Sequence, residues 1–201
     1  QQPESIALAQ KIERHAIATP IYSQAIVTSF VRQGEGNIPI LLLHGFDSSV
    51  LEFRRLIPLL AAQHETWAVD LLGFGFSDRP RGINYNPKTI KSHLHDFWKT
   101  LIDKPVILVG TSMGGATAID FTLTYPQAVK HLVLINSVGF SGDFPLGQFL
   151  FFPLDYLAVE FWRQRKIQAL NLGTSLGNLT PFEIDAIRCA LLHTEMPRWS
   201  E

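Results

Sequence analysis

Ser112 lies in a stretch whose residue types and spacing fit nucleophilic chemistry. Residues 110–114 have the sequence GTSMG, which matches the pattern G-x-S-x-G. An apolar, β-branched run, residues 106–109, precedes them, and the apolar spacing typical of a helix follows. A serine on a sharp turn between a strand and a helix projects its hydroxyl into an open site. The pattern therefore predicts a nucleophilic serine, the alternative being a glycine-rich loop with an incidental serine.

The glycines around Ser112 are expected to make this turn sterically possible. The turn forces strained backbone angles on the serine and brings the residues two before and two after it close together. Gly110 and Gly114 fit there because side chains at these positions would collide. Gly115 would let the following helix pack close to the sheet. That helix would direct its positive N-terminus at the serine, where an oxyanion forms.

Two further motifs resemble those of the α/β-hydrolase superfamily. Residues 41–46, LLLHGF, are similar to the family's strand followed by H-G-x, and residues 70–80, DLLGFGFSDRP, resemble its D-x-x-G-x-G-x-S-D-x-P loop. The turn at Ser112 matches the branch with G-x-S-M-G-G, and the three motifs stand in the family's order. The resemblance implies an α/β fold, a mostly parallel sheet with helices on both faces plus a helical cap. It says less about the substrate.

The resemblance also assigns roles around the nucleophile. The backbone N–H groups of Phe46 and Met113 would form an oxyanion hole. His44 and Gly45 begin the first of these loops, and His44 would hold the loop and not act as the base. Asp70 would belong to its own loop and not to a catalytic triad. No metal or cofactor is expected.

The elements that would position these residues alternate along the chain, as in a parallel sheet whose ligands bind beyond the carboxyl ends of the strands. Periodicity predicts a helix over 3–18, an edge strand or hairpin arm over 21–31, strands over 38–43, 66–71, 106–109 and 131–137, and helices over 47–63 and 89–102. Pro58 implies an early-turn position or a kink in its helix.

Some polar side chains are expected to be solvated. His93 and His95 lie off the apolar face of the helix over 89–102, and residues two apart do not converge on a helix, so they are not expected to hold a metal. Asp78 and Arg79 are expected to pair with each other at the surface.

Composition narrows the function classes. The 201 residues are 46% hydrophobic with a net charge of −1, which suits a globular domain and gives no basic excess for nucleic acid. The single cysteine, Cys189, excludes an internal disulfide and fits a reducing compartment. The N-terminus lacks the pattern of a signal peptide, so a cytoplasmic location is predicted, although no initiating methionine is present.

After Gly139 the sequence shows no further buried strand and becomes rich in aromatic residues. This change predicts a hydrolase core over 1–139 and a helical cap over 140–201. The cap segment is rich in aromatic residues, including Phe149 and Phe152, which would line an apolar pocket or pack the cap on the core. Prolines and charges interrupt it, so no membrane span is expected.

The chain shows no clear partner for the nucleophile. A serine hydrolase needs a base and an acid, which the family places after two further strands. His193 and Asp143 are poor candidates for these roles. The chain therefore resembles the N-terminal two-thirds of a cap-bearing serine hydrolase: a fragment, a truncated gene product or the ordered part of a longer protein. An unpaired sheet edge would favour a partner chain, and a homo-oligomer is one such arrangement.

The leading hypothesis is a hydrolase that forms an acyl-enzyme on Ser112 with a small apolar ester. The resemblance also admits hydrolases of carbon–carbon bonds and perhydrolase-like enzymes. It disfavours haloalkane dehalogenases and epoxide hydrolases, which carry Asp in place of this serine. The alternative is a non-catalytic binding protein that keeps the fold, because the base is missing.

Overall fold

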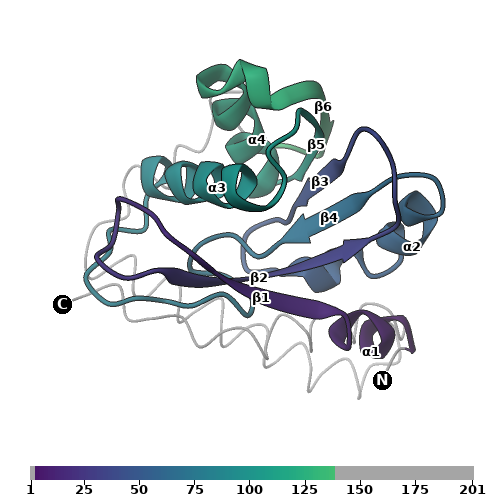
Figure 1. Cartoon of the computed structure of the whole chain (residues 1–201), viewed down its shortest axis with the longest axis horizontal. Coiled ribbons are helices and arrows are strands. Elements are labelled where there is room, and N and C mark those ends of the chain that lie inside the picture. The colour runs from purple at the N-terminus through teal and green to yellow at the C-terminus, as the bar shows by residue number, and fades with distance from the viewer. Residues whose placement is uncertain (1–2, 139–201) are drawn as a thin grey trace, which may run out of the picture. The chain divides into compact units, whose positions relative to one another are not determined.

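A six-stranded sheet organises the described part of the chain, residues 3–138 of the computed structural model (Figure 1). The strand order is β1-β2-β4-β3-β5-β6; β2 pairs antiparallel with β1 and β4, and the other pairs are parallel. The mostly parallel sheet that the sequence predicts is therefore confirmed. The strands are β1 (Ile12–Ile17), β2 (Ile26–Gln33), β3 (Ile40–Leu43), β4 (Thr66–Val69), β5 (Val106–Thr111) and β6 (Val129–Ile135).

One helix precedes the first strand, and the other helices lie between or after the parallel strands. They are α1 (Pro3–Ala9), the short 3-10 helix η1 (Val50–Phe53), α2 (Leu56–Ala61), α3 (Pro87–Leu101), α4 (Met113–Thr124) and the 3-10 turn η2 (Pro126–Ala128). The start of α3 is well defined, because Asn86 caps it by accepting a hydrogen bond from the Thr89 N–H at 3.0 Å and Pro87 occupies the first turn.

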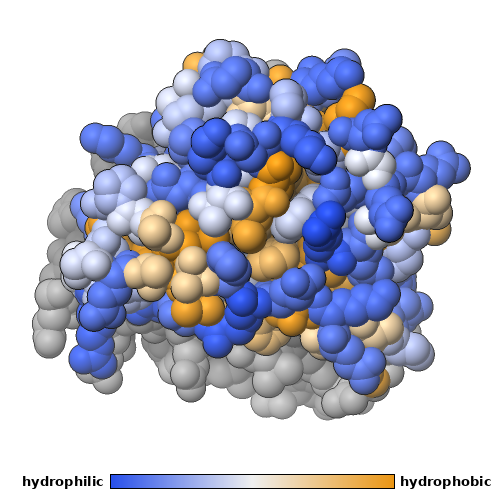
Figure 2. Space-filling model, in the orientation of Figure 1, coloured by the Kyte–Doolittle hydropathy of each residue, from blue (hydrophilic) through white to orange (hydrophobic). Residues whose placement is uncertain are grey.

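The main core lies between the sheet and the pair α3 and α4. Alternate residues of the strands, such as Leu41, Leu43 and Leu108, pack with Phe97 of α3 and Phe121 of α4. The helix α2 packs against β4 and β2 and contributes nothing to this cluster, so it covers the other face of the sheet. In Figure 2, polar side chains cover the region of α3 and α4, and apolar ones gather toward the middle of the face.

The predicted helix over residues 3–18 is wrong in its second half. The helix ends at Ala9, and Ile12–Ile17 is the edge strand β1, in register with β2 from Ile12 opposite Val31 to Ile17 opposite Ile26. Only Ile17 of this strand is buried, so its exposed residues show no strand alternation, and their spacing imitated a helix. The hairpin arm predicted over 21–31 is confirmed as β2, which lies inside the sheet and not at its edge.

The predicted helix over residues 47–63 is divided into η1 and α2. Pro58 is the third residue of α2, a position where its missing N–H costs no helical hydrogen bond. A continuous helix from Val50 would place Pro58 in its interior, so the α-helix can begin only shortly before this proline. The predicted capping segment is confirmed, since the Ser49 hydroxyl accepts a hydrogen bond from the Leu51 N–H at 3.3 Å.

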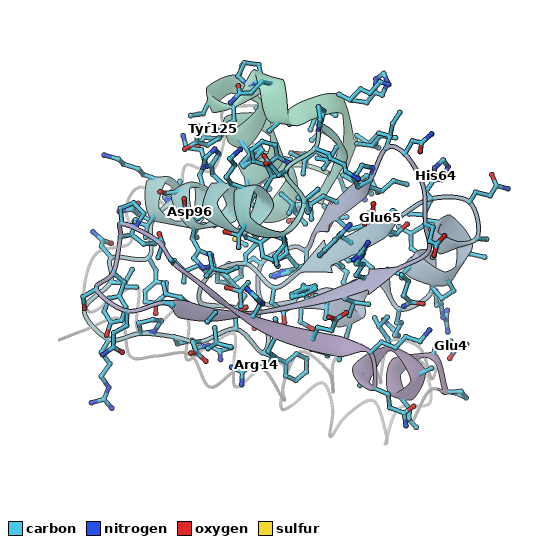
Figure 3. The ribbon with its side chains drawn as sticks, in the orientation of Figure 1. Glu4, Arg14, His64, Glu65, Asp96 and Tyr125 are labelled. Atoms are coloured by element: carbon cyan, nitrogen blue, oxygen red, sulfur yellow. The ribbon has the colours of Figure 1, made fainter. Side chains whose placement is uncertain are left out.

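His93 is buried, contrary to the prediction that it is solvated. Its Nε2 lies 3.1 Å from the Thr28 hydroxyl of β2, and burial lowers its pKa to about 4. The prediction failed because α3 also packs against the antiparallel end of the sheet, where it contacts β1 and where Thr28 of β2 meets His93. His95 is half-buried and stacks on Tyr125, the residue that follows α4, with ring centroids 4.0 Å apart. Figure 3 labels Tyr125 and Asp96, the neighbour of His95 in α3.

Asp78 and Arg79 do not pair with each other. Asp78 instead forms an ion pair at 2.7 Å with Arg14 of β1, which is labelled in Figure 3. Arg79 donates hydrogen bonds to the carbonyls of Gly73 and Gly75. The local sequence could not predict this, because Arg14 reaches Asp78 only through the strand pairing.

Several predictions fall outside the described residues. These are the helical cap over 140–201, its boundary with the core at residue 139, and the residues Asp143, Cys189 and His193. They stay predictions. Among the helices within residues 3–138, none combines the length and apolar character that crossing a membrane requires.

Candidate active site

Ser112 occupies the junction between β5 and α4 with an unusual backbone conformation. Its φ is 49° and its ψ is −117°, a region that residues with a Cβ rarely adopt. The backbone is held by the Ser112 N–H, which donates to the Ile135 carbonyl at 3.2 Å, and by the Val138 N–H, which donates to the Ser112 carbonyl at 3.2 Å. The side chain makes no capping hydrogen bond to α4, so the helix does not use the hydroxyl.

The glycines around this turn are packed against backbone. A Cβ at Gly110 would lie 2.4 Å from the Gly114 carbonyl oxygen, and one at Gly114 would lie 2.3 Å from the Leu43 carbonyl oxygen. A Cβ at Gly115 would lie 2.4 Å from the Ser137 hydroxyl. The crowding therefore comes from three different directions: the turn itself, the end of β3, and the residues after β6.

The loop that follows β3 lies beside the serine. A Cβ built on Gly45 would be 3.4 Å from the Cβ of Ser112. His44 is fully buried, and its Nε2 accepts a hydrogen bond from the Leu71 N–H at 3.1 Å. That bond leaves the ring proton on Nδ1, which donates to the Gly45 carbonyl oxygen at 2.7 Å. Both ring nitrogens of His44 are thus used by the loop.

The hydrogen bond from His44 fixes the direction of a neighbouring N–H group. The carbonyl of Gly45 and the N–H of Phe46 belong to the same planar, trans peptide unit. Holding one therefore orients the other. No acceptor for the Phe46 N–H is found within the described part of the chain. Met113 is the first residue of α4, where the N–H has no partner within the helix.

Asp70 directly follows β4 and is fully buried in the scaffold. Its carboxylate accepts hydrogen bonds from the Val50 N–H at 2.7 Å, the Phe76 N–H at 2.9 Å and the Ser29 hydroxyl at 2.7 Å. A Cβ at Gly75 would lie 2.2 Å from the carboxyl carbon of Asp70, so the loop closes tightly on this side chain. Asp70 therefore joins β2, η1 and the loop that follows it.

Comparison with protein families now places these motifs in a known fold. Residues 38–169, more than half of the 201 residues, match the family model of the alpha/beta hydrolase fold. The chain belongs to the α/β-hydrolase family. The match begins just before β3 and includes the His44 loop, the Asp70 loop and the turn at Ser112.

Curated relatives of this α/β hydrolase are longer than the chain. An "alpha/beta hydrolase domain-containing protein VTE7" of Arabidopsis thaliana is 36% identical over 208 residues, covering 100% of this chain and 63% of the relative. A "2-hydroxy-6-oxo-2,4-heptadienoate hydrolase" of Pseudomonas putida is 35% identical, covering 62% of this chain and 46% of the relative. The chain therefore spans about half to two thirds of the length of these relatives.

Solved structures agree with the fold. A "meta-cleavage product hydrolase" of Pseudomonas fluorescens is 29% identical with a TM-score of 0.58, covering 65% of this chain and 47% of that one. A "probable hydrolytic enzyme" of Pseudomonas aeruginosa gives a TM-score of 0.70 at 24% identity, with coverage of 90% and 60%. At that identity, the second likeness speaks for the fold alone.

The structure brings the sequence-predicted residues of two separate motifs together and adds Glu52, which the sequence analysis missed. Glu52 of η1 accepts a hydrogen bond from the Gly45 N–H at 2.9 Å and another from the Thr111 hydroxyl. Phe46 has an exposed side chain whose ring meets Phe74 edge-on at 5.8 Å. A lone glutamate in a helical turn carries no motif, so no sequence signal singled out Glu52. Within residues 3–138, no cluster of residues suited to a metal ion is found.

Proposed function

We propose that the full-length protein is a serine hydrolase that cleaves small apolar carboxylic esters, or related acyl or carbon–carbon bonds, through an acyl-enzyme on Ser112. The observation that carries the proposal is the conformation of Ser112. Its backbone is held at a positive φ between β5 and α4, and α4 does not engage its hydroxyl. Strain of this kind persists where the surroundings enforce it, often at reactive sites. The relatives named as hydrolases support the same class.

In the proposed mechanism, the Ser112 oxygen attacks the carbonyl carbon of the substrate while a base takes the hydroxyl proton. The resulting oxyanion accepts hydrogen bonds from the N–H groups of Phe46 and Met113, next to the N-terminus of α4. Collapse of this intermediate expels the alcohol, which receives the proton from the base, and water then releases the acyl group by the same steps.

The base in this mechanism is not His44. Both of its ring nitrogens are engaged, one by the Leu71 N–H and the other by the Gly45 carbonyl, so it has no lone pair left to receive the proton of Ser112. Asp70 is equally engaged by three donors. The proposal therefore assigns the base to a histidine other than His44 and the acid to a carboxylate other than Asp70, both expected from the family resemblance in the chain after β6.

The apolar surface beside the site supports an apolar substrate. The side chain of Phe46 is 56% exposed although the N–H of the same residue is a predicted oxyanion donor, and its ring packs edge-on against Phe74. An exposed aromatic side chain next to the reacting centre offers contact to an alkyl or aryl group of a substrate.

A fluorophosphonate probe applied to the full-length protein tests the proposal. Such probes label a serine only when its hydroxyl is activated, so we expect labelling of the wild-type protein and none of Ser112→Ala. Ser92→Ala, on α3, is a matched control that should label like the wild type. An unlabelled but folded wild-type protein would instead favour a non-catalytic binding protein that retains the fold.

A further inference from the structure

We propose that Glu52 is a positioning residue that ties the loop carrying the oxyanion donor to the strand carrying the nucleophile. This inference rests on the proposed function of Ser112. The two segments come from separate parts of the chain, one after β3 and the other at the end of β5. A single carboxylate accepts a hydrogen bond from each of them.

The contacts of Glu52 lie directly beside the site. One carboxylate oxygen accepts the Gly45 N–H at 2.9 Å, and the other accepts the hydroxyl of Thr111, the residue before Ser112. A Cβ built on Gly45 would have the Ser112 Cβ at 3.4 Å and the first of these oxygens at 3.7 Å as its two nearest neighbours. Glu52 and Ser112 therefore face the same small residue.

With this contact, the backbone of Gly45 is held on both sides. His44 binds its carbonyl at 2.7 Å, and Glu52 binds its N–H at 2.9 Å. The first bond fixes the peptide plane after Gly45 and the second fixes the plane before it. A glycine otherwise rotates more freely than any other residue. Fixing both planes sets the direction of the Phe46 N–H before the substrate arrives, and such preorganised donors stabilise the transition state.

An ordinary helix-end role does not account for Glu52. It lies in the first turn of η1, where a carboxylate can favour a helix dipole. That end is already satisfied, because Ser49 accepts the Leu51 N–H and Asp70 accepts the Val50 N–H. With only four residues, η1 also has little dipole to stabilise. The Glu52 side chain instead turns toward Gly45 and Thr111.

Three variants of the full-length protein test the inference with a p-nitrophenyl ester. We expect Glu52→Ala to lower kcat roughly tenfold to hundredfold while KM changes less than about twofold, because misplaced donors act on the transition state. Glu52→Gln should recover most of the loss, since its amide oxygen can accept the Gly45 N–H and its amide nitrogen can donate to the Thr111 hydroxyl. Thr111→Val should lower kcat about threefold or more, as one of the two arms is lost.

A boronic acid that bonds to the nucleophile separates positioning from mere structural support. Its tetrahedral adduct places an oxygen in the oxyanion hole, so its inhibition constant should rise in Glu52→Ala by about the same factor as kcat/KM falls. Glu13→Ala, at an exposed position of β1, is the matched control and should change neither quantity.

The outcomes distinguish this inference from the proposed function. Wild-type protein that neither labels with fluorophosphonate nor turns over the ester overturns both. Wild-type protein that is active, with Glu52→Ala equally active, overturns the role of Glu52 alone. A KM effect without a kcat effect, or boronic acid affinity that stays unchanged, also overturns it. If Glu52→Ala does not fold, Thr111→Val decides, because unchanged kcat in that variant contradicts the inference.

Discussion

Asp70 and Ser112 follow β4 and β5, two strands that flank β3 in the sheet. Asp70 is fully buried, and its carboxylate accepts three hydrogen bonds from three separate segments. Ser112 is half-buried and strained, and α4 makes no use of its hydroxyl. The same edge of one sheet therefore carries one polar side chain that is bound on several sides by the fold and another that the following helix does not bind. The two side chains differ mainly in how many hydrogen bonds the surrounding segments make to them, and less in residue type or position.

The largest expected effect is on activity, at Ser112. In the full-length protein, Ser112→Ala should lower kcat by about a thousandfold or more, because no other group replaces the nucleophile. Its melting temperature should stay close to that of the wild type, since the hydroxyl bonds to nothing in α4. Ester turnover measured beside a melting curve checks both parts. Turnover that survives the substitution would show that the strained serine is not the nucleophile.

The converse is expected at Asp70. Asp70→Ala should lower the free energy of unfolding by about 3 kcal/mol or more, because two buried donors and one partly buried donor lose their acceptor together. Asp78→Ala is the matched control: Asp78 pairs with Arg14 at the surface, and such pairs contribute about 0–1 kcal/mol. Urea unfolding measures both. If the two variants lost the same free energy of unfolding, the buried hydrogen bonds of Asp70 would not contribute more than a surface ion pair, and the contrast between Asp70 and Ser112 would not hold.

His93 extends the comparison to pH. Desolvation lowers its pKa from the ordinary histidine value of 6.5 to about 4, with Asp96 opposing the shift. The unfolded chain therefore binds a proton first as the pH falls. The contribution of neutral His93 is fully present above about pH 6.5 and is lost as the pH falls toward about 4, in total roughly 3 kcal/mol.

Unfolding free energies at pH 7.5 and pH 4 check this expectation. The wild type should lose more stability between the two pH values than His93→Gln, whose side chain does not titrate. His15→Gln, on the exposed edge strand β1, is the control and should keep the wild-type slope. Equal slopes in all three proteins would mean that His93 is solvated after all.

Much of the fold could be predicted because buried strands are short apolar runs. β3 and β5 stand out in this way, and α3 stands out by its single apolar face, whereas its start at Pro87 with the Asn86 cap is seen only in the structure. The edge strand β1 could not be predicted, because exposure on both faces removes the alternation that marks a strand. The burial of His93 also escaped, since it depends on the Thr28 strand, which is remote in sequence.

The candidate site divides in the same way. Ser112 and the glycines could be singled out because the turn needs particular residue types at fixed spacing, and His44 because its loop resembles a motif of the family. Glu52 and Ser29 could not, because each acts on a segment that only the fold brings near. A carboxylate that bridges two loops leaves no local pattern. The sequence therefore predicts well where a tight turn requires small residues. It predicts poorly which hydrogen-bond donor, remote in sequence, a polar side chain contacts.

The smallest expected effect concerns the strain at Ser112 and sharpens its contrast with Asp70. Ser112→Gly and Ser112→Ala both remove the nucleophile, so both should be inactive. They differ in backbone freedom: glycine adopts φ 49° readily, whereas alanine keeps the unfavourable conformation. After the entropy that glycine adds to the unfolded chain is allowed for, Ser112→Gly should still be more stable than Ser112→Ala by about 1 kcal/mol. Urea unfolding of the two inactive proteins gives this difference directly. An alanine variant that is as stable as the glycine variant would mean that the junction holds no strain, and Ser112 would then owe its exposure to the turn's geometry alone.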